Sequence, residues 1–197
     1  MTTGAFYQQQ DDRFLWDRLR EGDREAFSEI YRRYFPLLFR YCSRFTHDTG
    51  LVKDTLQDFF TDLYLRRAML GTPDKPKSYL LVSVRRKLVR ALDKVPFTRT
   101  LPEEQEPVFL LELSPESYLI SRQTAATAER HVQQTLDRLT LRQKEAVYLR
   151  FYESLSYDEI AEVMQLKAVK YARTLVYRAL TELKPLLAGA EALLFSR

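Results

Sequence analysis

The stretch SYDEIAEVMQLKAVKYARTLVYRAL, residues 156–180, decides the fold class because it holds two helical patterns separated by a few residues. Ser156 followed by Glu159 is the capping-box pattern that begins a helix, and Ile160 and Val163 give that helix an apolar side. A short helix, a tight turn and a longer helix are the parts of a helix-turn-helix. The stretch therefore predicts an all-α unit with this motif.

The second helix of the stretch carries a basic outer face. Placed at about 100° per residue, residues 168–184 divide into an apolar and a polar side. The polar side holds Lys170, Arg173, Thr174, Tyr177 and Lys184. A bare helix fits the major groove of DNA, where long basic side chains reach base edges and phosphates. A solvated amphipathic helix in a bundle is the alternative interpretation of this pattern alone.

A second basic face is predicted on a helix over residues 78–94. Between Lys75 and Arg99 there are eight basic residues and one acidic residue. The basic face consists of Arg86, Lys87, Arg90 and Lys94, with Tyr79 among them. Cations with an aromatic ring between them suit phosphate contact combined with base stacking. Because two separate segments show such faces, binding to nucleic acid explains them better than simple exposure to solvent does.

The helix predicted over residues 51–68 has the opposite charge. Asp54, Asp58 and Asp62 recur at intervals of four, so they share one side of the helix, with Gln57 beside them. Like charges at this spacing cost a few tenths of a kcal/mol per pair. An acidic side of this kind suits a basic protein surface rather than DNA. A solvated face is the other interpretation.

Composition divides the chain into two helical modules. Residues 101–120 contain five Glu, three Pro and no basic residue, which excludes a continuous helix and predicts an acidic linker. We predict a helical domain over residues 12–94, a linker over 95–125, a helix-turn-helix domain over 126–187 and a tail over 188–197. The polar N-terminal tip is expected to fray. Asp23, directly after Gly22, is the predicted N-cap of a second helix.

Charge and cysteine usage indicate a cytoplasmic protein. The net charge is +4, and the single cysteine, Cys42, forms no internal disulfide, as expected in a reducing compartment. No signal peptide is recognised, and no apolar run reaches the roughly 20 residues of a membrane span. His47 and His131 are far apart and have no cysteine near them, so we expect neither a metal site nor a cofactor.

Four segments together resemble the extracytoplasmic-function sigma factors of bacterial RNA polymerase. GDREAFSEIYRRYFPLLFRYC (residues 22–42) resembles the start of the family's second region, and LVKDTLQDFFTDLY (residues 51–64) resembles its polymerase-docking helix. PKSYLLVSVRRKLVRALDK (residues 76–94) resembles the segment that opens the minus-ten promoter element. Residues 136–184 resemble the fourth region, which holds the minus-thirty-five element, and this is the most specific match.

The resemblance implies functional residues and partners. Polymerase contacts fall on Asp54, Gln57, Asp58 and Asp62. Minus-ten contacts fall on Tyr79, Arg85, Arg86 and Arg90, and the same basic face adds Lys87 and Lys94. Minus-thirty-five contacts fall on Lys170, Arg173, Thr174 and Tyr177, with Arg178 beside them. The implied partners are the β′ and β subunits of core RNA polymerase, promoter DNA and an anti-sigma factor. No small-molecule substrate is implied.

Several positions depart from the family pattern, and three of them bear on function or turn geometry. The family usually has Asn at the position of Arg86 and often Asp at that of Arg90. Since guanidinium favours phosphate or guanine, we predict a changed minus-ten preference. Gln165 stands where the turn commonly has Gly, so either Gln165 adopts a strained positive φ or the turn takes another shape.

The function predicted from these observations is promoter selection and opening by a non-enzymatic initiation subunit. A stand-alone helix-turn-helix regulator is the main alternative, and it requires no polymerase contact. A metal-dependent nuclease using Asp54, Asp58 and Asp62 is the enzymatic alternative. A helical interaction scaffold, without DNA affinity at low salt, is the third.

Overall fold

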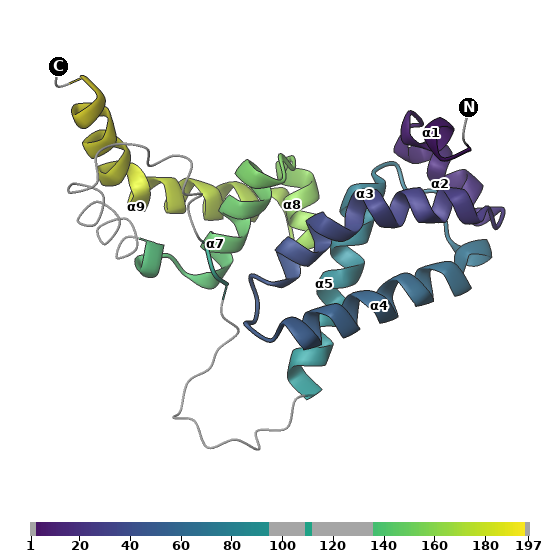
Figure 1. The fold of residues 1–197 in the computed structure, drawn as a ribbon. Helices are drawn as coiled ribbons and strands as arrows, with labels where there is room; N and C mark the ends of the chain where they lie inside the picture. The colour runs from purple at the N-terminus through teal and green to yellow at the C-terminus, as the bar shows by residue number, and fades with distance from the viewer. Residues whose placement is uncertain (1–2, 95–108, 112–135, 196–197) are drawn as a thin grey trace. The chain divides into compact units, whose positions relative to one another are not determined.

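The computed structural model describes residues 3–94, 109–111 and 136–195, which belong to two compact units, residues 1–106 and 107–197. The described residues of both units form helices, and no strand occurs among them (Figure 1). The predicted all-α class is therefore confirmed.

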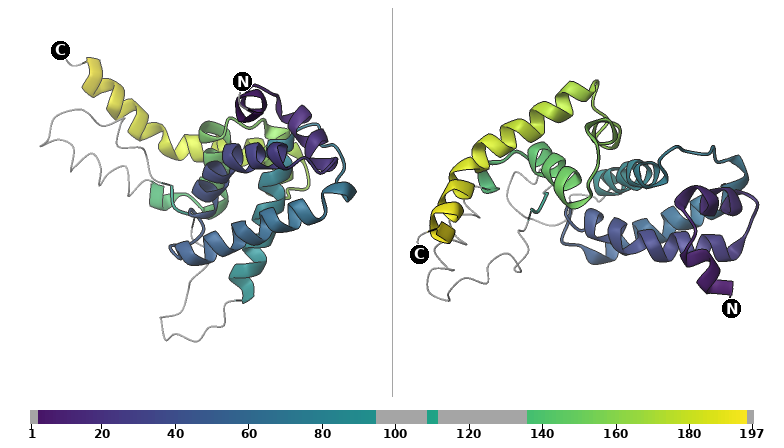
Figure 2. Two further views of the ribbon diagram at one scale, coloured as in Figure 1. Left: turned by 45° about the vertical axis from the view of Figure 1, so that its right-hand side comes forward. Right: turned by 90° about the horizontal axis from the view of Figure 1, so that it is seen from above.

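Helix α3 (Arg24–Cys42) is the centre of the N-terminal unit. It packs against α1 (Thr3–Gln8), α2 (Asp12–Arg20), α4 (Thr49–Leu65) and α5 (Pro76–Lys94), as Figures 1 and 2 show. A short 3-10 turn, η1 (Arg67–Met69), follows α4, so the helix predicted over residues 51–68 ends at Leu65. The core contains side chains with no exposed surface, namely Leu15, Leu19, Leu38, Leu56, Leu80, Leu81, Val84 and Leu88.

Aspartate caps begin three of these helices. The carboxylates of Asp11, Asp23 and Asp48 accept hydrogen bonds from backbone N–H groups in the first turns of α2, α3 and α4, at 2.7–3.2 Å. Such caps contribute about 1 kcal/mol each. The predicted cap at Asp23 is confirmed.

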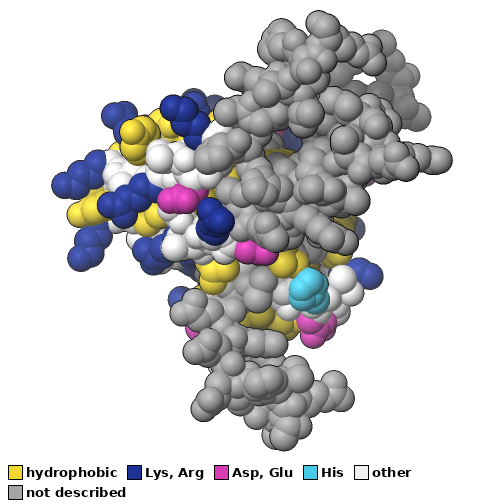
Figure 3. Space-filling view, turned by 90° about the vertical axis from the view of Figure 1, so that its left-hand side faces the viewer, with side chains coloured by type: hydrophobic (Ala, Val, Ile, Leu, Met, Phe, Trp, Pro, Cys, Tyr) yellow, Lys and Arg dark blue, Asp and Glu magenta, His cyan; other side chains and the backbone are white. Residues whose placement is uncertain are grey.

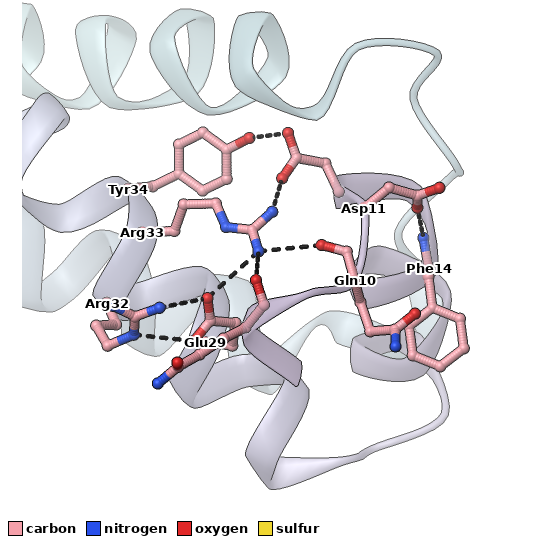
Figure 4. A network of polar contacts seen from close by, with 9 residues as sticks. Gln10, Asp11, Phe14, Glu29, Arg32, Arg33 and Tyr34 are labelled. Carbon is pink, nitrogen blue, oxygen red and sulfur yellow. Dashed lines mark hydrogen bonds and ion pairs between the residues drawn. The ribbon is translucent and has the colours of Figure 1, made fainter. Parts of the chain in front are cut away.

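A cluster of ion pairs ties α2 and α3 together (Figure 4). Arg33 donates to Asp12 Oδ1 at 2.6 Å, to Glu29 Oε1 at 3.3 Å and to the carbonyl of Gln10 at 3.1 Å. Arg32 makes a two-pronged pair with Glu29, and Tyr34 donates its hydroxyl hydrogen to Asp12. Glu29 is only 5% exposed, so its charge depends on these partners.

The expected fraying of the N-terminal tip is wrong from Thr3 onward, where α1 begins. Tyr7 of α1 is buried, and its hydroxyl donates to Asp23 Oδ2 at 2.5 Å. Its ring also meets the ring of Phe6 edge to face. The burial of Tyr7 and its hydrogen bond to Asp23 therefore hold this short helix on the unit.

The C-terminal unit is built on α9 (Val169–Phe195), which packs against α7 (Leu141–Val147) and α8 (Tyr157–Val163). A π-helical turn, η3 (Tyr148–Tyr152), extends α7. Helix α9 continues to Phe195, whereas the sequence predicted a separate tail from residue 188. The core includes Leu149, Ile160, Val163, Ala172 and Ala179.

Two residues of the predicted linker pack inside the C-terminal unit. Phe109 is 1% exposed and meets the ring of Tyr148 edge to face at 5.8 Å, and Leu111 is also buried. The rest of the predicted linker, residues 95–108 and 112–125, lies outside the described residues, as do residues 126–135. This short apolar run therefore belongs to the helix-turn-helix unit rather than to a solvated spacer.

Replacing Glu29 with Gln tests the ion-pair cluster. The hydrogen bonds and charge of Arg32, followed by those of Arg33, hold the pKa of Glu29 below its usual 4.5, although burial opposes this shift. We expect Glu29→Gln to lower the free energy of unfolding of the N-terminal unit by about 1–3 kcal/mol at neutral pH. Urea unfolding followed by the emission of Trp16, the one tryptophan of the chain, measures this change.

The effect of Glu29→Gln depends on pH in a defined direction. A lowered carboxyl pKa stabilises the folded state above the unfolded pKa, and this stabilisation is lost as the pH falls through the folded pKa. The difference between wild type and Glu29→Gln should therefore shrink as the pH falls below the unfolded pKa and disappear once Glu29 is protonated in the folded state. Glu25→Gln, at an exposed site on the same helix, is the control. An equal difference at neutral and acidic pH would show that the carboxylate charge is not responsible.

Candidate functional site

Helix α4 presents an exposed carboxylate edge opposite its buried side. Its buried residues include Val52, Leu56, Phe59, Phe60 and Leu63, and this burial turns Asp54, Gln57, Asp58 and Asp62 to the outside. Among the described side chains, no ion pair with Asp54 or Asp58 is found within 4.0 Å. Two exposed carboxylates thus lie one helical turn apart.

Asp62 behaves differently from the other two aspartates. Its Oδ2 accepts a hydrogen bond from Lys87 Nζ of α5 at 2.5 Å, which holds the pKa of Asp62 below its usual range. The sequence assigned these two residues to different partners, polymerase and DNA. They neutralise each other instead, and they mark the border between the acidic side of α4 and the basic side of α5.

An apolar hollow of about 450 Å³ opens beside the carboxylate edge. Gln57 and Thr61 belong both to its lining and to the outer side of α4. The remaining lining consists of Phe27, Tyr31, Phe35, Lys53, Phe60, Tyr64 and Leu65. Leu65 is 70% exposed, and the rings of Tyr31 and Phe35 stack at 5.0 Å. Exposed apolar side chains gathered in this way are typical of protein contact surfaces.

The outer face of α5 is basic, as predicted. Arg86 and Arg90 are exposed on the side opposite the buried leucines, and Arg85 is half-buried. Lys87 is bound by Asp62, and the side chain of Lys94 lies outside the described part of the chain. Tyr79 is 36% exposed, and its ring meets that of the buried Trp16 at 5.2 Å. One tyrosine and two unburied guanidinium groups thus share this face.

The turn between α8 and α9 has the geometry of a Schellman motif. Leu166 N–H donates to the carbonyl of Ala161 at 2.8 Å, and Gln165 N–H donates to that of Glu162 at 3.1 Å. Gln165 has φ 53°, in the left-handed region that favours glycine. Of the two possibilities left open by the sequence, the strained one is correct. The capping box of Ser156 and Glu159 is confirmed at the other end of α8.

The outer face of α9 presents the predicted residues to solvent. Lys170, Arg173, Thr174, Tyr177 and Arg178 are all exposed. Figure 3 views the molecule from the side at which α9 is labelled, and Lys and Arg side chains gather along one edge of that view with few acids among them. The Thr174 hydroxyl donates to the carbonyl of Lys170 at 2.8 Å, which leaves its oxygen able to accept.

One tyrosine near this face was missed by the sequence reasoning. The guanidinium groups of Arg150 and Arg173 lie 4.9 Å and 5.6 Å from the ring centre of Tyr157, within the range of cation–π attraction. Tyr157 begins α8 and is half-buried. Tyr157 of α8 therefore contacts Arg173 of α9. Helical periodicity, which is read one helix at a time, gives no signal for a contact between two helices.

Two family models match these units. The model for sigma-70 region 2 matches residues 30–95, and the model for sigma-70 region 4 matches residues 130–183. The chain belongs to the sigma-70 family of RNA polymerase sigma factors. The family's members are transcription initiation factors rather than enzymes.

Curated relatives extend this similarity over most of the sigma factor's length. RNA polymerase sigma-H factor of Pseudomonas aeruginosa is 28% identical over 182 residues, covering 87% of this chain and 91% of the relative. RNA polymerase sigma factor YlaC of Bacillus subtilis is 27% identical, with 82% and 91% covered. ECF RNA polymerase sigma factor SigK of Mycobacterium ulcerans is 24% identical, with 81% and 85% covered. The extracytoplasmic-function assignment is thus supported.

Solved structures show that the fold is shared. CnrH, in complex with the cytosolic domain of CnrY, has a TM-score of 0.60 at 20% identity, with 90% of this chain and 97% of that chain covered. RpoE of Bartonella quintana, in complex with the anti-sigma factor NepR, has a TM-score of 0.57 at 17% identity, with 83% and 98% covered.

The described residues contain no group of three or more His, Cys, Asp or Glu side chains able to hold a metal ion. Asp54, Asp58 and Asp62 follow one side of a helix and do not converge on one point, so they form no nuclease-like cluster. Within the described part of the sigma factor, no helix is both long enough and apolar enough to span a membrane.

Gln165→Gly tests the strain in the turn before α9. A non-glycine residue in the left-handed region costs about 1–2 kcal/mol, and part of this is offset by the greater freedom of glycine in the unfolded chain. We expect Gln165→Gly to raise the melting temperature of the C-terminal unit, and Gln165→Val to lower it. Thermal unfolding followed by circular dichroism measures both melting temperatures against that of the wild type. If Gln165→Gly is the less stable variant, the turn is not strained.

Proposed function

We propose that this sigma factor docks on core RNA polymerase through the carboxylate edge of α4, with Asp54, Gln57 and Asp58 as the main contacts. The supporting observation is the separation of charge by helix face: acids outside on α4, and bases outside on α5 and α9. A basic surface of the β′ subunit complements exposed carboxylates. Asp62 contributes less, because a polymerase cation must compete with Lys87 for it.

The apolar hollow beside the carboxylate edge strengthens this docking proposal. Charge complementarity mainly guides encounter and register, whereas most binding free energy comes from buried anchors at the centre of an interface. Gln57 and Thr61 lie both on the polar side of α4 and at the hollow. A polymerase segment with one apolar side chain next to its basic residues can therefore use both features at once.

The outer face of α5 is proposed to hold the melted non-template strand of the minus-ten element. Arg85, Arg86, Arg90 and Lys94 supply cations for phosphates, and an unstacked base stacks on Tyr79. Lys87 contributes less, because a phosphate must compete with Asp62 for it. Stacking on Tyr79 favours the melted over the paired state, because only unpaired bases expose their faces. Guanidinium at positions 86 and 90 favours guanine or phosphate contact over the amide readout usual in the family.

The outer face of α9 is proposed to read the minus-thirty-five element. Lys170, Arg173 and Thr174 reach base edges in the major groove, and Tyr177 and Arg178 reach the adjacent backbone. Each unit alone binds DNA weakly. When both are held on one polymerase, the second contact becomes intramolecular and the effective concentration rises. We infer that the holoenzyme recognises promoters much better than the sigma factor alone.

Regulation and location follow from the same surfaces. An anti-sigma factor that covers the α4 and α9 faces would keep the protein silent, and two of the structures similar to this fold are of complexes with CnrY and with NepR. We propose that the sigma factor acts in the cytoplasm, where core polymerase and promoter DNA are found. The acidic linker threads toward the active-site or RNA-exit channel in this proposal.

Alanine at Asp54 and Asp58 tests the docking face. Truncating charged interface residues commonly costs 2–5 kcal/mol, so we expect the double variant to bind core polymerase at least about 30-fold more weakly. Circular dichroism should be unchanged, because both side chains are exposed. Asp93→Ala, which removes one exposed acid from the same unit, is the control. Undiminished polymerase binding by the double variant would favour a stand-alone regulator.

Alanine at Lys170 or Arg173 tests the upstream contact. Each base-specific contact is worth about 1–3 kcal/mol, so the holoenzyme footprint over the minus-thirty-five element should weaken. On a promoter with a strong minus-ten element, the footprint over that element should persist. Lys184→Ala removes a charge from the same helix and should cause only a small loss that does not depend on sequence. Footprints unchanged by Lys170→Ala and Arg173→Ala would show that another surface reads the DNA.

A further inference from the structure

Helix α2 holds the loop that leads from η1 into α5. Trp16 Nε1 donates to the carbonyl of Gly71 at 2.9 Å. Arg20 Nη1 donates to Thr72 Oγ1 at 2.8 Å, and Thr72 Oγ1 donates to Asp17 Oδ1 at 3.2 Å. Successive turns of one helix thus bind two neighbouring loop residues, and we call this set of contacts the α2 clamp.

The α2 clamp also reaches Tyr79. The rings of Trp16 and Tyr79 meet edge to face, with centres 5.2 Å apart and planes at 77°. Trp16 is 1% exposed and held at its nitrogen by Gly71, whereas Tyr79 is 36% exposed. A fixed buried ring against one side of a partly exposed ring limits the orientations that the exposed ring adopts.

The α2 clamp combines a buried aromatic contact with polar contacts on the surface. The contacts of Arg20 and Thr72 lie on the surface, where polar pairs contribute little to folding stability.

We propose that Trp16, Asp17, Arg20 and Thr72 are positioning residues that hold the Gly71–Thr72 loop and thereby keep Tyr79 ready for the melted non-template strand. The proposal rests on the proposed role of Tyr79 in minus-ten binding. A loop and ring that are already ordered lose less conformational freedom when a base stacks on them. The α2 clamp therefore acts on promoter opening rather than on upstream recognition.

Thr72→Val is the decisive variant because it keeps the shape of the side chain and removes both hydrogen bonds. Holoenzyme made with full-length protein is tested on a promoter with 2-aminopurine in the minus-ten element, whose fluorescence follows strand opening. Ordering one side chain costs about 0.5–1.5 kcal/mol, so we expect the open complex to dissociate about two- to tenfold faster. Thr72→Ser should restore the wild-type lifetime, and Trp16→Phe should shorten it.

Four controls separate positioning from folding. The melting temperature of Thr72→Val should equal that of wild type, and its binding to a duplex minus-thirty-five element should be unchanged. Thr181→Val, a matched change at an exposed site on α9, should leave open-complex lifetime unaltered. In a Tyr79→Ala background, Thr72→Val should add no further loss, because the α2 clamp acts through that ring.

The outcomes distinguish this inference from the proposed function. If Tyr79→Ala shortens the open-complex lifetime but Thr72→Val does not, the α2 clamp has no role in opening, and the proposed function stands. An equal effect of Thr72→Val with and without Tyr79 would also overturn positioning through the ring. If Tyr79→Ala itself has no effect, the proposed minus-ten contact fails, and the inference fails with it.

Discussion

The burial of one side of each helix determines which charges the sigma factor shows to its partners. On α5 four apolar side chains have no exposed surface; they are Leu80, Leu81, Val84 and Leu88. Each contributes about 1.5–3 kcal/mol by burial, far more than a surface charge pair. Rotating α5 to hide Arg86 and Arg90 would expose this whole stripe, so the basic side is held outward by the core. The same constraint turns Asp54 and Asp58 outward on α4.

This arrangement divides one small unit between two partners of opposite charge. Core polymerase is proposed to meet the carboxylates of α4, and DNA the guanidinium groups of α5. The hydrogen bond between Asp62 and Lys87 lies where these two sides approach each other. Because that pair is partly exposed, it adds little stability, but it neutralises the charges that would otherwise disturb either partner. The helix-turn-helix unit needs no such border, since its proposed recognition face is basic and its proposed partner is DNA.

Local sequence patterns predicted much of this structure, and long-range contacts account for what they missed. The caps at Asp23 and Ser156 and the outer face of α9 follow from neighbours within a few residues, and each was predicted. The contact between Trp16 and Gly71 joins residues 55 positions apart, so periodicity holds no signal for it. The pairing of Lys87 with Asp62 is likewise visible only after α4 and α5 pack. Phe109 was assigned to the linker because flanking prolines and glutamates dominated the composition.

The most direct test of the account is transcription reconstituted from core RNA polymerase, this sigma factor and a library of genomic promoter fragments, with transcript 5′ ends mapped by sequencing. The division of charge between α4 and α5 implies that the sigma factor binds core polymerase and promoter DNA at the same time. We therefore expect transcripts with defined 5′ ends that core polymerase alone does not make, preceded by a shared pair of upstream elements. If adding the sigma factor produces no defined start on any fragment, the central claim is contradicted.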